Sequence, residues 1–594
     1  MIDRQWLKIS EMQVTLQEQA KDLRSLSSKF RNNTQDFQVG VPRNGSNIPD
    51  KNLIPAAFKN AYQATQQPDY AEGDWFVRAF GNVKTITPYV SQDTYASIVQ
   101  KNVLESLLVR NGETLKWQGL LAESWQESED GLTFTFKIRP EARFSDGTEL
   151  TADDVVFTYN FVMNEKIAAP QYRVSFVKIK SVTATNKHEV VFVYKEPYYN
   201  ALFDTGWEMK ILPKHFYEKY LKDPHSFNQS KGLLLGSGPY RLKDPVSWTP
   251  DKGFIELERN PRYWGFVQPP FDKLIWKFIE NASARLTTFR NGDIDNYRAR
   301  PVEYKKLLSD KEILSKSDNW EYMSPVAGYS YIGWNQQRNN NPTRFADKRV
   351  RQAMTYLTDR KGFIKDIMLG YAEPAISPFN PRTKQHAPEL LPREYDLEKA
   401  RLLLKSAGYE DRDGDGIIED INNKAFEFEI IYSQDSEDTK RIVLYLKDSY
   451  ARAGILLKPN PTEWTVLLDK LNTRTFDGII LGWSSGLETD VSQMFHSNQI
   501  KDGDNYTHYS NKELDRLIGE ARRTVDEKRR MKIWQKVEHI LYEDQPYTFL
   551  MRSKSLQFID KRIKNLAIDK LGLNYRRIPY ETYVPVKAQR YAPK

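Results

Sequence analysis

Hydrophobic and polar positions follow two different periods along this chain. Leu132–Ile138 reads L-T-F-T-F-K-I, and this strict alternation predicts a half-buried strand. Further strand-like runs lie at 74–82, 189–193, 254–258, 274–279, 329–335, 426–431 and 476–482. Helical patterns lie at 348–369, 397–407, 511–524 and 527–542. Strands and helices mix throughout without a short repeat, which predicts an α/β or α+β architecture.

Acidic residues gather at 146–154, where turn and cap roles account for them. Asp146-Gly147 is a tight-turn dipeptide. Thr151 is a suitable N-cap for the helical pattern that follows, and Asp154 stands three positions later, as in a capping box. We therefore expect structural roles for these residues rather than an acid/base pair.

The first thirty residues carry a heptad pattern instead. Apolar residues recur every seven positions at Ile2, Ile9, Leu16, Leu23 and Phe30, with Met12 and Leu26 on a second seam. The pattern fits a coiled coil that joins copies, or a stalk that holds the protein away from a membrane. It fits equally well one amphipathic helix packed on the body. Residues 31–70 are polar and rich in turn formers, which predicts a linker.

Length and charge narrow the class of protein. A chain of 594 residues is too long for one hydrophobic core, so we expect two or three domains. The apolar and charged fractions, 40% and 28%, are typical of a soluble globular protein. The aromatic fraction of 13% is high, and such a surplus suits a large ligand-contacting cleft. The formal charge of +8 is spread along the chain without a basic block, so no nucleic-acid partner is expected.

The sequence contains no cysteine, which excludes disulfides, thiolate nucleophiles and cysteine-ligated zinc. Its absence suits a periplasmic or extracellular protein that folds without oxidation. No stretch of about 18 apolar residues is present, so no membrane span is predicted. The amino terminus also lacks the apolar region of a signal peptide. If the protein is exported, we expect its leader or membrane anchor to be a segment absent from this chain.

Several motifs follow one another at fixed spacing. They are Leu121-Ala122-x-Ser124-Trp125, Phe144-Ser145-Asp146-Gly147-Thr148, Thr151-Ala152-Asp153-Asp154-Val155, Leu212-Pro213-Lys214-His215, Gly236-Ser237-Gly238-Pro239-Tyr240, Glu258-Arg259-Asn260-Pro261-Arg262-Tyr263-Trp264, Gly292-Asp293-Ile294-Asp295 and Arg349-Val350-Arg351-Gln352-Ala353. In this order they resemble the family 5 extracellular solute-binding proteins, which are the oligopeptide- and dipeptide-binding receptors of ABC importers. The resemblance runs from about Asp74 to Pro585.

The resemblance implies an α/β fold of the periplasmic-binding-protein type II class, with two lobes that close on a ligand. Lobe I is then discontinuous, at 71–108, 233–324 and 546–588, and carries an extra domain at 109–232. Lobe II is 325–545. The crossings near 324 and 546 would act as the hinge. The heptad helix at 1–30 and the linker at 31–70 lie outside the resemblance.

The same resemblance implies a function in transport. The protein would capture peptides outside the cytoplasm, most simply oligopeptides, and deliver them to a membrane permease. No enzyme activity, cofactor or metal is implied. Another solute, such as an oligosaccharide, is the alternative ligand. A third interpretation gives the heptad arm a structural or sensory role.

Gly482, Trp483 and Ser484 are the first candidate ligand-binding residues, because the resemblance places a Gly-Trp pair at the end of a strand that faces the cleft. Glycine permits close backbone approach, and the indole offers a flat apolar face to side chains of any kind. The best-known peptide binders carry an aspartate three residues after this tryptophan to hold the peptide α-amine. This chain has Gly486 there.

Glu488 and Asp490 follow the glycine and are the candidates to replace that aspartate. If neither reaches the cleft, the ligand is a blocked peptide or a different solute. Trp334 and Asn335 after the predicted hinge, Tyr172 in the extra domain and Ser97 in lobe I complete the candidate ligand-binding residues.

The pentad from Gly482 to Gly486 also matches G-x-S-x-G, the motif of a serine nucleophile in α/β hydrolases. Asp490 followed by a histidine would complete the order of a catalytic triad. Asp490 comes only six residues after Ser484, however, and no HGGG-like oxyanion segment occurs. The sequence therefore favours a binding loop over a hydrolase.

The segment 411–416, Asp-Arg-Asp-Gly-Asp-Gly, begins like an EF-hand loop. Its twelfth position is Asn422 rather than the bidentate glutamate of that loop. A polar connecting turn is the first interpretation, and a partial calcium site is the alternative.

Overall fold

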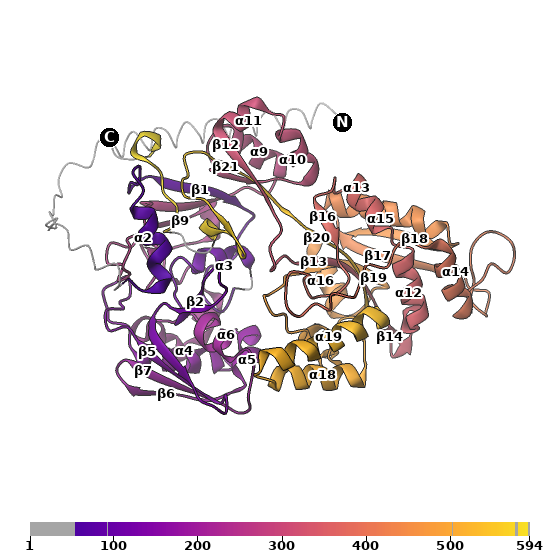
Figure 1. The fold of residues 1–594 in the computed structure, drawn as a ribbon, viewed down its shortest axis with the longest axis horizontal. Coiled ribbons are helices and arrows are strands. Elements are labelled where there is room, and N and C mark those ends of the chain that lie inside the picture. Colours follow the sequence, from indigo (N-terminus) through magenta and orange to yellow (C-terminus); the bar gives the residue numbers. More distant parts are fainter. Residues whose placement is uncertain (1–53, 92, 502, 577–579, 592–594) are drawn as a thin grey trace. The chain divides into compact units, whose positions relative to one another are not determined.

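A computed structural model describes residues 54–91, 93–501, 503–576 and 580–591. The predicted heptad helix and most of the predicted linker lie outside these residues. From Pro55 onward the chain forms one compact unit (Figure 1). None of the helices in the described part of the chain is both long enough and apolar enough to cross a membrane.

A six-stranded mixed sheet carries the Gly482-Trp483 pair. Its strands, in spatial order, are β16 (Ala372–Pro374), β20 (Tyr547–Ser553), β13 (Tyr329–Trp334), β19 (Gly478–Trp483), β17 (Glu427–Ser433) and β18 (Leu456–Thr462). β17 runs parallel to β18 and β19, while β13 runs antiparallel to β19 and β20. The inner strands β13 and β20 are buried on both faces, as expected for strands covered by helices on each side, whereas β17 and β18 carry exposed charged residues on one face.

Helices cover the two faces of the six-stranded sheet. One buried cluster joins Ile332, Trp334 and Ile430 to helices α12 (Lys348–Tyr356), α14 (Leu397–Ser406) and α15 (Glu437–Ala451). The opposite cluster joins Tyr329, Tyr331 and Tyr547 to the packed pair α18 (Lys512–Arg523) and α19 (Glu527–Asp544). Along β13 the side chains alternate between these two clusters, which follows from the two-residue period of a strand.

Two four-stranded sheets and one three-stranded sheet make up most of the other strands. The first has the order β1 (Trp75–Phe80), β10 (Lys273–Phe278), β9 (Phe254–Arg259) and β8 (Tyr240–Arg241). The second is antiparallel, with the order β4 (Ala122–Glu127), β5 (Thr133–Ile138), β7 (Glu189–Tyr194) and β6 (Ile179–Asn186). The three-stranded sheet has the order β11 (Asn296–Arg298), β21 (Ser555–Asp560) and β12 (Ser317–Tyr322).

Short hairpins and further helices complete the fold. The hairpins are β2 (Leu108–Arg110) with β3 (Trp117–Gly119), β14 (Gln337–Arg338) with β15 (Asn341–Pro342), and β22 (Ile568–Asp569) with β23 (Gly572–Leu573). The further α-helices are α2 (Lys59–Thr65), α3 (Thr94–Gln100), α4 (Ala152–Met163), α5 (Pro170–Phe176), α6 (Ala201–Phe203), α7 (Lys214–Tyr217), α8 (Pro224–Gln229), α9 (Ala282–Arg290), α10 (Pro301–Leu307), α11 (Lys311–Lys316), α13 (Arg360–Asp366), α16 (Trp464–Asn472) and α17 (Ser492–Phe495).

The sequence patterns located most of these elements. β5 occupies the predicted alternating strand. α4 begins where the capping pattern indicated, and the Asp154 carboxylate accepts a hydrogen bond from the Thr151 backbone N–H at 2.9 Å. The single helix predicted at 348–369 is two helices, because Asp359 caps a new helix by accepting from the Gly362 N–H.

The chain crosses twice between the three-stranded and the six-stranded sheets. The first crossing is the segment 323–328, between β12 and β13. The second is Lys554 alone, between β20 and β21. The sequence analysis placed the second crossing near 546. The structure places it later because β20 pairs with β13 in the six-stranded sheet. The division into lobes itself stays a prediction.

Candidate ligand-binding site

Strand β19 ends at Trp483 with one side open. β13 pairs with β19 along its whole length, from Gly478 to Trp483. β17 pairs only with Gly478 and Ile479. From Ile480 to Trp483, the side of β19 that faces away from β13 has no strand partner within the described residues. Backbone groups on such a side can pair with an extended ligand, as in strand addition.

The first crossing touches this strand end closely. A Cβ at Gly328 would lie 2.3 Å from the carbonyl oxygen of Trp483, so only glycine fits there. A Cβ at Gly482 would lie 3.2 Å from the Tyr329 carbonyl oxygen, which is tight but less severe. Movement of the crossing would therefore act directly on the Trp483 backbone.

The Trp483 side chain is half-buried and packs against the aromatic cluster that includes Tyr329, Tyr331 and Trp534. Its indole Nε1 and the Tyr331 side chain lie near the Tyr547 hydroxyl, and within the described residues neither Nε1 nor that hydroxyl has a partner with the geometry of a hydrogen bond. Burial raises the pKa of Tyr547. The cluster thus supplies an apolar surface beside Trp483, with these two polar atoms buried inside it.

Arg552 fixes the loop after Trp483 from inside the protein. Its guanidinium is 1% exposed and donates to the carbonyl oxygens of Ala327 at 2.9 Å, Ser377 at 2.9 Å and Pro378 at 3.0 Å, and to Ser485 Oγ at 3.3 Å. Burial lowers the pKa of Arg552 to about 10. One cation thereby joins the first crossing, the segment 377–378 and the loop.

Arg552 was not predicted from the sequence. The one pattern that could have indicated it is a lone charge at the end of the otherwise apolar strand Tyr547–Ser553. A charge at such a position is paired or hydrogen-bonded when it is buried.

Glu488 is paired with an arginine of α19. Arg530 Nε donates to Glu488 Oε1 at 2.6 Å, and Arg530 Nη2 donates to Oε2 at 3.0 Å. The indole Nε1 of Trp534 also donates to Oε1, at 2.9 Å. Arg530 Nη1 further donates to the carbonyl oxygen of Thr524 at 2.9 Å. The pair thus ties the loop to the connection between α18 and α19.

Asp490 is paired with an arginine of α18. Arg522 Nε lies 3.0 Å from Asp490 Oδ2. The other carboxylate oxygen of Asp490 accepts from the Ser492 N–H at 2.9 Å. Glu488 and Asp490, the two carboxylates predicted as site residues from the sequence, are therefore each paired with an arginine.

Trp334 and Asn335 lie inside the protein. Trp334 is fully buried, stacks on Phe345 with ring centroids 4.7 Å apart, and donates from Nε1 to Thr548 Oγ1 at 2.9 Å. The Asn335 amide donates to the carbonyl oxygens of Arg474 at 2.9 Å and of Phe476 at 3.0 Å. These contacts give both residues a place in the core, and direct ligand contact by either one stays a prediction.

Tyr172 and Ser97 belong to other parts of the fold. Tyr172 lies on α5 and meets Tyr89 edge to face, with ring centroids 4.9 Å apart. Burial raises the pKa of Tyr172 to about 12. Ser97 is exposed on α3 and donates to the Asp93 carbonyl oxygen at 3.1 Å. No hydrogen bond, ion pair or ring contact within the described residues joins either one to Trp483, so their roles stay predictions.

If the protein were a serine hydrolase, Ser484 would need a catalytic base beside it. The histidines that follow it in the sequence have other partners, His508 with Asn335 Oδ1 and His539 with Glu389. His496 Nδ1 lies 3.5 Å from Asp515. Within the described residues no histidine forms a hydrogen bond with Ser484. A nucleophilic serine needs a base within about 3 Å.

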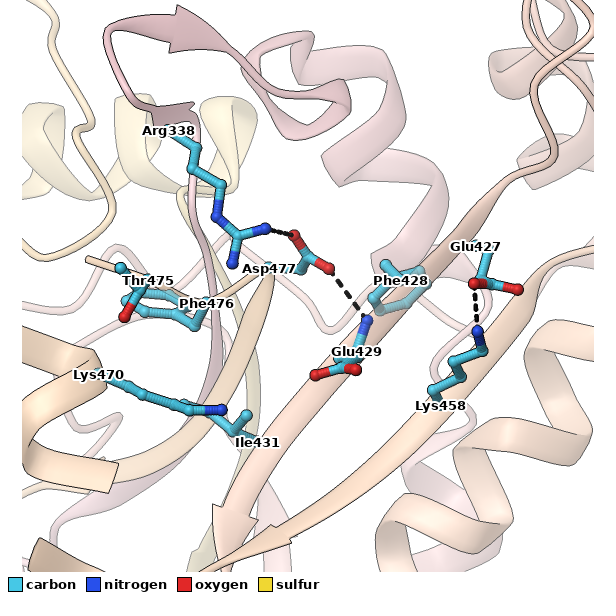
Figure 2. A pocket seen from close by; sticks show the side chains of 10 residues that line it. All are labelled: Arg338, Glu427, Phe428, Glu429, Ile431, Lys458, Lys470, Thr475, Phe476 and Asp477. Atoms are coloured by element: carbon cyan, nitrogen blue, oxygen red, sulfur yellow. Dashed lines mark hydrogen bonds and ion pairs between the residues drawn. The ribbon is translucent and has the colours of Figure 1, made fainter. Parts of the chain in front are cut away.

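A hollow of about 290 Å³ lies near the amino end of β19, away from Trp483. Figure 2 shows its charged residues turned toward one another, with Arg338 Nη1 3.2 Å from Asp477 Oδ1 and Lys458 paired with Glu427. Ile431 and Phe476, which share one buried apolar cluster, are among the residues that line it. At about 3.3 Å per residue, the length of β19 separates this hollow from Trp483 by roughly 17 Å.

The acidic loop at 411–419 brings three carboxyl groups together. Oxygen atoms of Asp411, Asp413 and Glu419 lie within 4.8 Å of one another. Glu419 Oε2 already accepts from the Arg412 N–H at 2.9 Å. These three residues stand at positions 1, 3 and 9 of the EF-hand pattern, and Asn422 at position 12 is the departure from that pattern in sequence.

Comparison with known proteins gives consistent results. The family model described as bacterial extracellular solute-binding proteins, family 5 Middle, matches residues 116–505. The oligopeptide-binding protein AppA of Bacillus subtilis is 33% identical over 490 residues, which cover 80% of this chain and 86% of AppA. The glutathione-binding protein GsiB of Salmonella typhi is 26% identical over 527 residues, covering 86% and 94%.

Solved structures match the fold over the same part of the chain. AppA from Bacillus subtilis in complex with a nonapeptide gives a TM-score of 0.73 at 28% identity and covers 86% of this chain and 99% of that chain. NikZ from Campylobacter jejuni in complex with Ni(L-His) gives a TM-score of 0.73 at 25% identity, covering 86% and 100%. The fold is therefore the mixed α/β fold of these binding proteins.

Proposed function

Because the chain belongs to the bacterial extracellular solute-binding proteins of family 5, we propose that it captures peptides and releases them unchanged to an ABC importer. The observation that carries this proposal is the 33% identity to an oligopeptide-binding protein across 80% of the chain. We propose further that the protein acts outside the cytoplasm, that a membrane permease is its partner, and that it needs no cofactor.

The open side of β19 is the part of the structure that best suits a peptide. An extended peptide exposes a row of backbone donors and acceptors, and the residues from Ile480 to Trp483 offer a matching row on the side away from β13. Gly482 leaves that row free of a side chain. Trp483 offers an apolar face to peptide side chains without selecting one sequence. Binding of this kind makes and breaks no covalent bond.

Lobe closure would complete the site. The two crossings, at 323–328 and at Lys554, are the segments where rotation between the three-stranded and six-stranded sheets would concentrate. Gly328 joins the first crossing to Trp483, so that closure and ligand contact would be coupled. Ser484, Glu488, Asp490, Trp334, Asn335, Tyr172 and Ser97 remain candidate residues of the closed site. A membrane stalk or an oligomer formed by residues 1–30 is part of the same proposal.

A ligand screen tests the proposal. The purified protein is heated with pooled peptides of five to nine residues and, separately, with pooled oligosaccharides, while mass spectrometry identifies any bound molecule. We expect stabilisation by peptides alone, of about 2.7 kcal/mol at a concentration a hundredfold above Kd, and recovery of the peptides intact. Stabilisation by oligosaccharides alone, or cleaved peptides, would contradict the proposal.

A further inference from the structure

The amino terminus of a free peptide carries an ammonium group that must be paired when it is buried. Taking an ion of this size out of water costs several kcal/mol unless an opposite charge and hydrogen bonds compensate. A binding protein that recognises the α-amine therefore needs an ionised carboxylate that has no other cation. Glu488 and Asp490 are the carboxylates that follow the Gly482-Trp483 pair.

The negative charge of Glu488 is already paired with a cation of the protein itself. Both of its oxygens accept from Arg530, at 2.6 and 3.0 Å, and one of them also accepts from Trp534 at 2.9 Å. The Arg530 side chain is 8% exposed and the Glu488 side chain 20% exposed. The pair is fork-shaped and largely out of water, which is the strongest geometry for a carboxylate with an arginine.

Asp490 also has an arginine as its ion-pair partner, on the neighbouring helix, through one contact instead of two hydrogen bonds. Arg522 lies 3.0 Å from Oδ2, and Oδ1 accepts from the Ser492 N–H at 2.9 Å. The two side chains are 28% and 22% exposed. Arg522 also stands over the Tyr198 ring, 5.7 Å from its centroid, which holds the guanidinium in place.

Asp204 is a third carboxyl group near this loop, and it interacts electrostatically with Asp490 and Arg522. It is 1% exposed, and its Oδ2 has no hydrogen-bond partner within the described residues. Burial raises the pKa of Asp204 well above its usual range, and the Lys178 ammonium opposes the rise. Burial therefore disfavours a negative charge on this group, and its position inside the protein keeps it from the peptide amine.

We propose that Arg522 and Arg530 determine ligand specificity by neutralising Asp490 and Glu488, so that the protein does not select for a free α-amine. Peptides blocked at the amino terminus are then bound as well as free ones. This inference rests on the proposed function and narrows its ligand class: the peptide is held along its backbone, and its amino-terminal charge contributes nothing at this loop.

A competition experiment measures the selectivity directly. The full chain is mixed with equal amounts of a peptide pool of five to nine residues and the same pool acetylated at the amino terminus. Native mass spectrometry then gives the ratio of free to acetylated peptide bound. We expect a ratio within about threefold of one, whereas recognition of the amine through an ion pair would give tenfold or more.

Conservative variants distinguish a carboxylate that binds the peptide amine from a carboxylate that its arginine neutralises. Asp490→Asn and Glu488→Gln should leave the ratio near one. A large loss of free peptide in either variant would identify that carboxylate as the amine acceptor and overturn the inference. Arg522→Gln releases the Asp490 carboxylate, so we expect the ratio to move at least threefold toward free peptides. An unchanged ratio in Arg522→Gln would show that Arg522 does not set the selectivity.

The matched control is Arg523→Gln, on the same helix. Arg523 is exposed and has no ion pair within the described residues, so its removal should leave the ratio unchanged. A shift equal to that of Arg522→Gln would point to net charge alone and contradict the inference. Failure of the whole chain to bind either peptide pool is a different result, because it removes the proposed function itself.

Discussion

The two ends of strand β19 use the same kind of ion pair in opposite surroundings. At the amino end, Lys458 and Glu427 are 57% and 42% exposed. At the carboxyl end, Arg530 and Glu488 are 8% and 20% exposed. Exposed pairs contribute about 0–1 kcal/mol, whereas removing one partner of a buried pair costs about 3–5 kcal/mol. Burial, and not the number of charges, therefore distinguishes the ion pair at the carboxyl end of the strand from the one at its amino end.

The largest expected effect comes from breaking the buried pair. Arg530→Met leaves Glu488 without its cation and removes the donor to the Thr524 carbonyl oxygen, so we expect the free energy of unfolding to fall by about 3–5 kcal/mol. Chemical denaturation measures this loss. The double variant with Glu488→Gln should recover part of it, because no unpaired carboxylate then remains. A loss below about 1 kcal/mol would show that the Arg530–Glu488 pair contributes no more to stability than the exposed pairs do.

Glu105 is a buried carboxyl group that forms no ion pair within the described residues, so it can be compared with the paired Glu488. Glu105 accepts from the Tyr263 hydroxyl at 2.9 Å and from Trp264 Nε1 at 2.7 Å, and burial raises its pKa to about 7. The folded protein thus holds this proton more tightly than the unfolded chain does. The resulting stability is present below about pH 4.5 and is lost as the pH rises through 7.

Glu105→Gln keeps a neutral acceptor and removes this titration. Relative to the wild type, we expect the variant to gain free energy of unfolding between pH 5 and pH 8, by on the order of 3 kcal/mol. Denaturation at several pH values checks the slope. Parallel stability curves for the two proteins would show that Glu105 does not titrate in this range.

Replacing Trp483 with alanine tests whether the carboxyl end of β19 is a surface that binds the peptide. Trp483→Ala should weaken peptide binding by about 2 kcal/mol, or roughly thirtyfold in Kd, because tryptophan contributes the largest contact area of any side chain. Trp464→Ala is the control, since it removes another partly exposed indole, 48% exposed at the start of α16. Equal affinities of Trp483→Ala and the wild type would remove Trp483 from the site.

The smallest effect is expected at the amino end of β19. Lys458→Met and Arg338→Met break the exposed pairs of the hollow in Figure 2, and each should change the free energy of unfolding by less than about 1 kcal/mol. The difference should shrink further at high salt, where exposed charges are screened. A loss comparable to that of Arg530→Met would erase the distinction between the two ends.

The sequence predicted the elements more completely than the site. Alternation gave β5, and the Thr151–Asp154 spacing gave the start of α4. The break between α12 and α13 was missed, because the apolar period continues through Asp359 and the cap at that residue competes with it only locally. The end of β20 was also missed, since a single residue separates it from β21 and no turn residue marks the change of sheet.

Site residues were harder to predict because their roles depend on partners far away in the sequence. Glu488 and Asp490 stay predicted site residues, and nothing near them in the sequence indicates that Arg530 and Arg522 pair with them. Arg552 was missed for the same reason. Trp334 looked like a cleft residue from its position after the first crossing, and only its stacking on Phe345 shows that it lies in the core.

The position of β20 and β21 close to the carboxyl terminus has a consequence for biosynthesis. β21 is the central strand of its sheet, and β20 lies between β16 and β13 in the other. Neither of these two sheets can close until β20 and β21, residues 547–560, have been synthesised. Until then the edges of β12 and β13 lack these partners. Both four-stranded sheets use only residues before 280, so they can form earlier in synthesis than the two sheets that share the crossings.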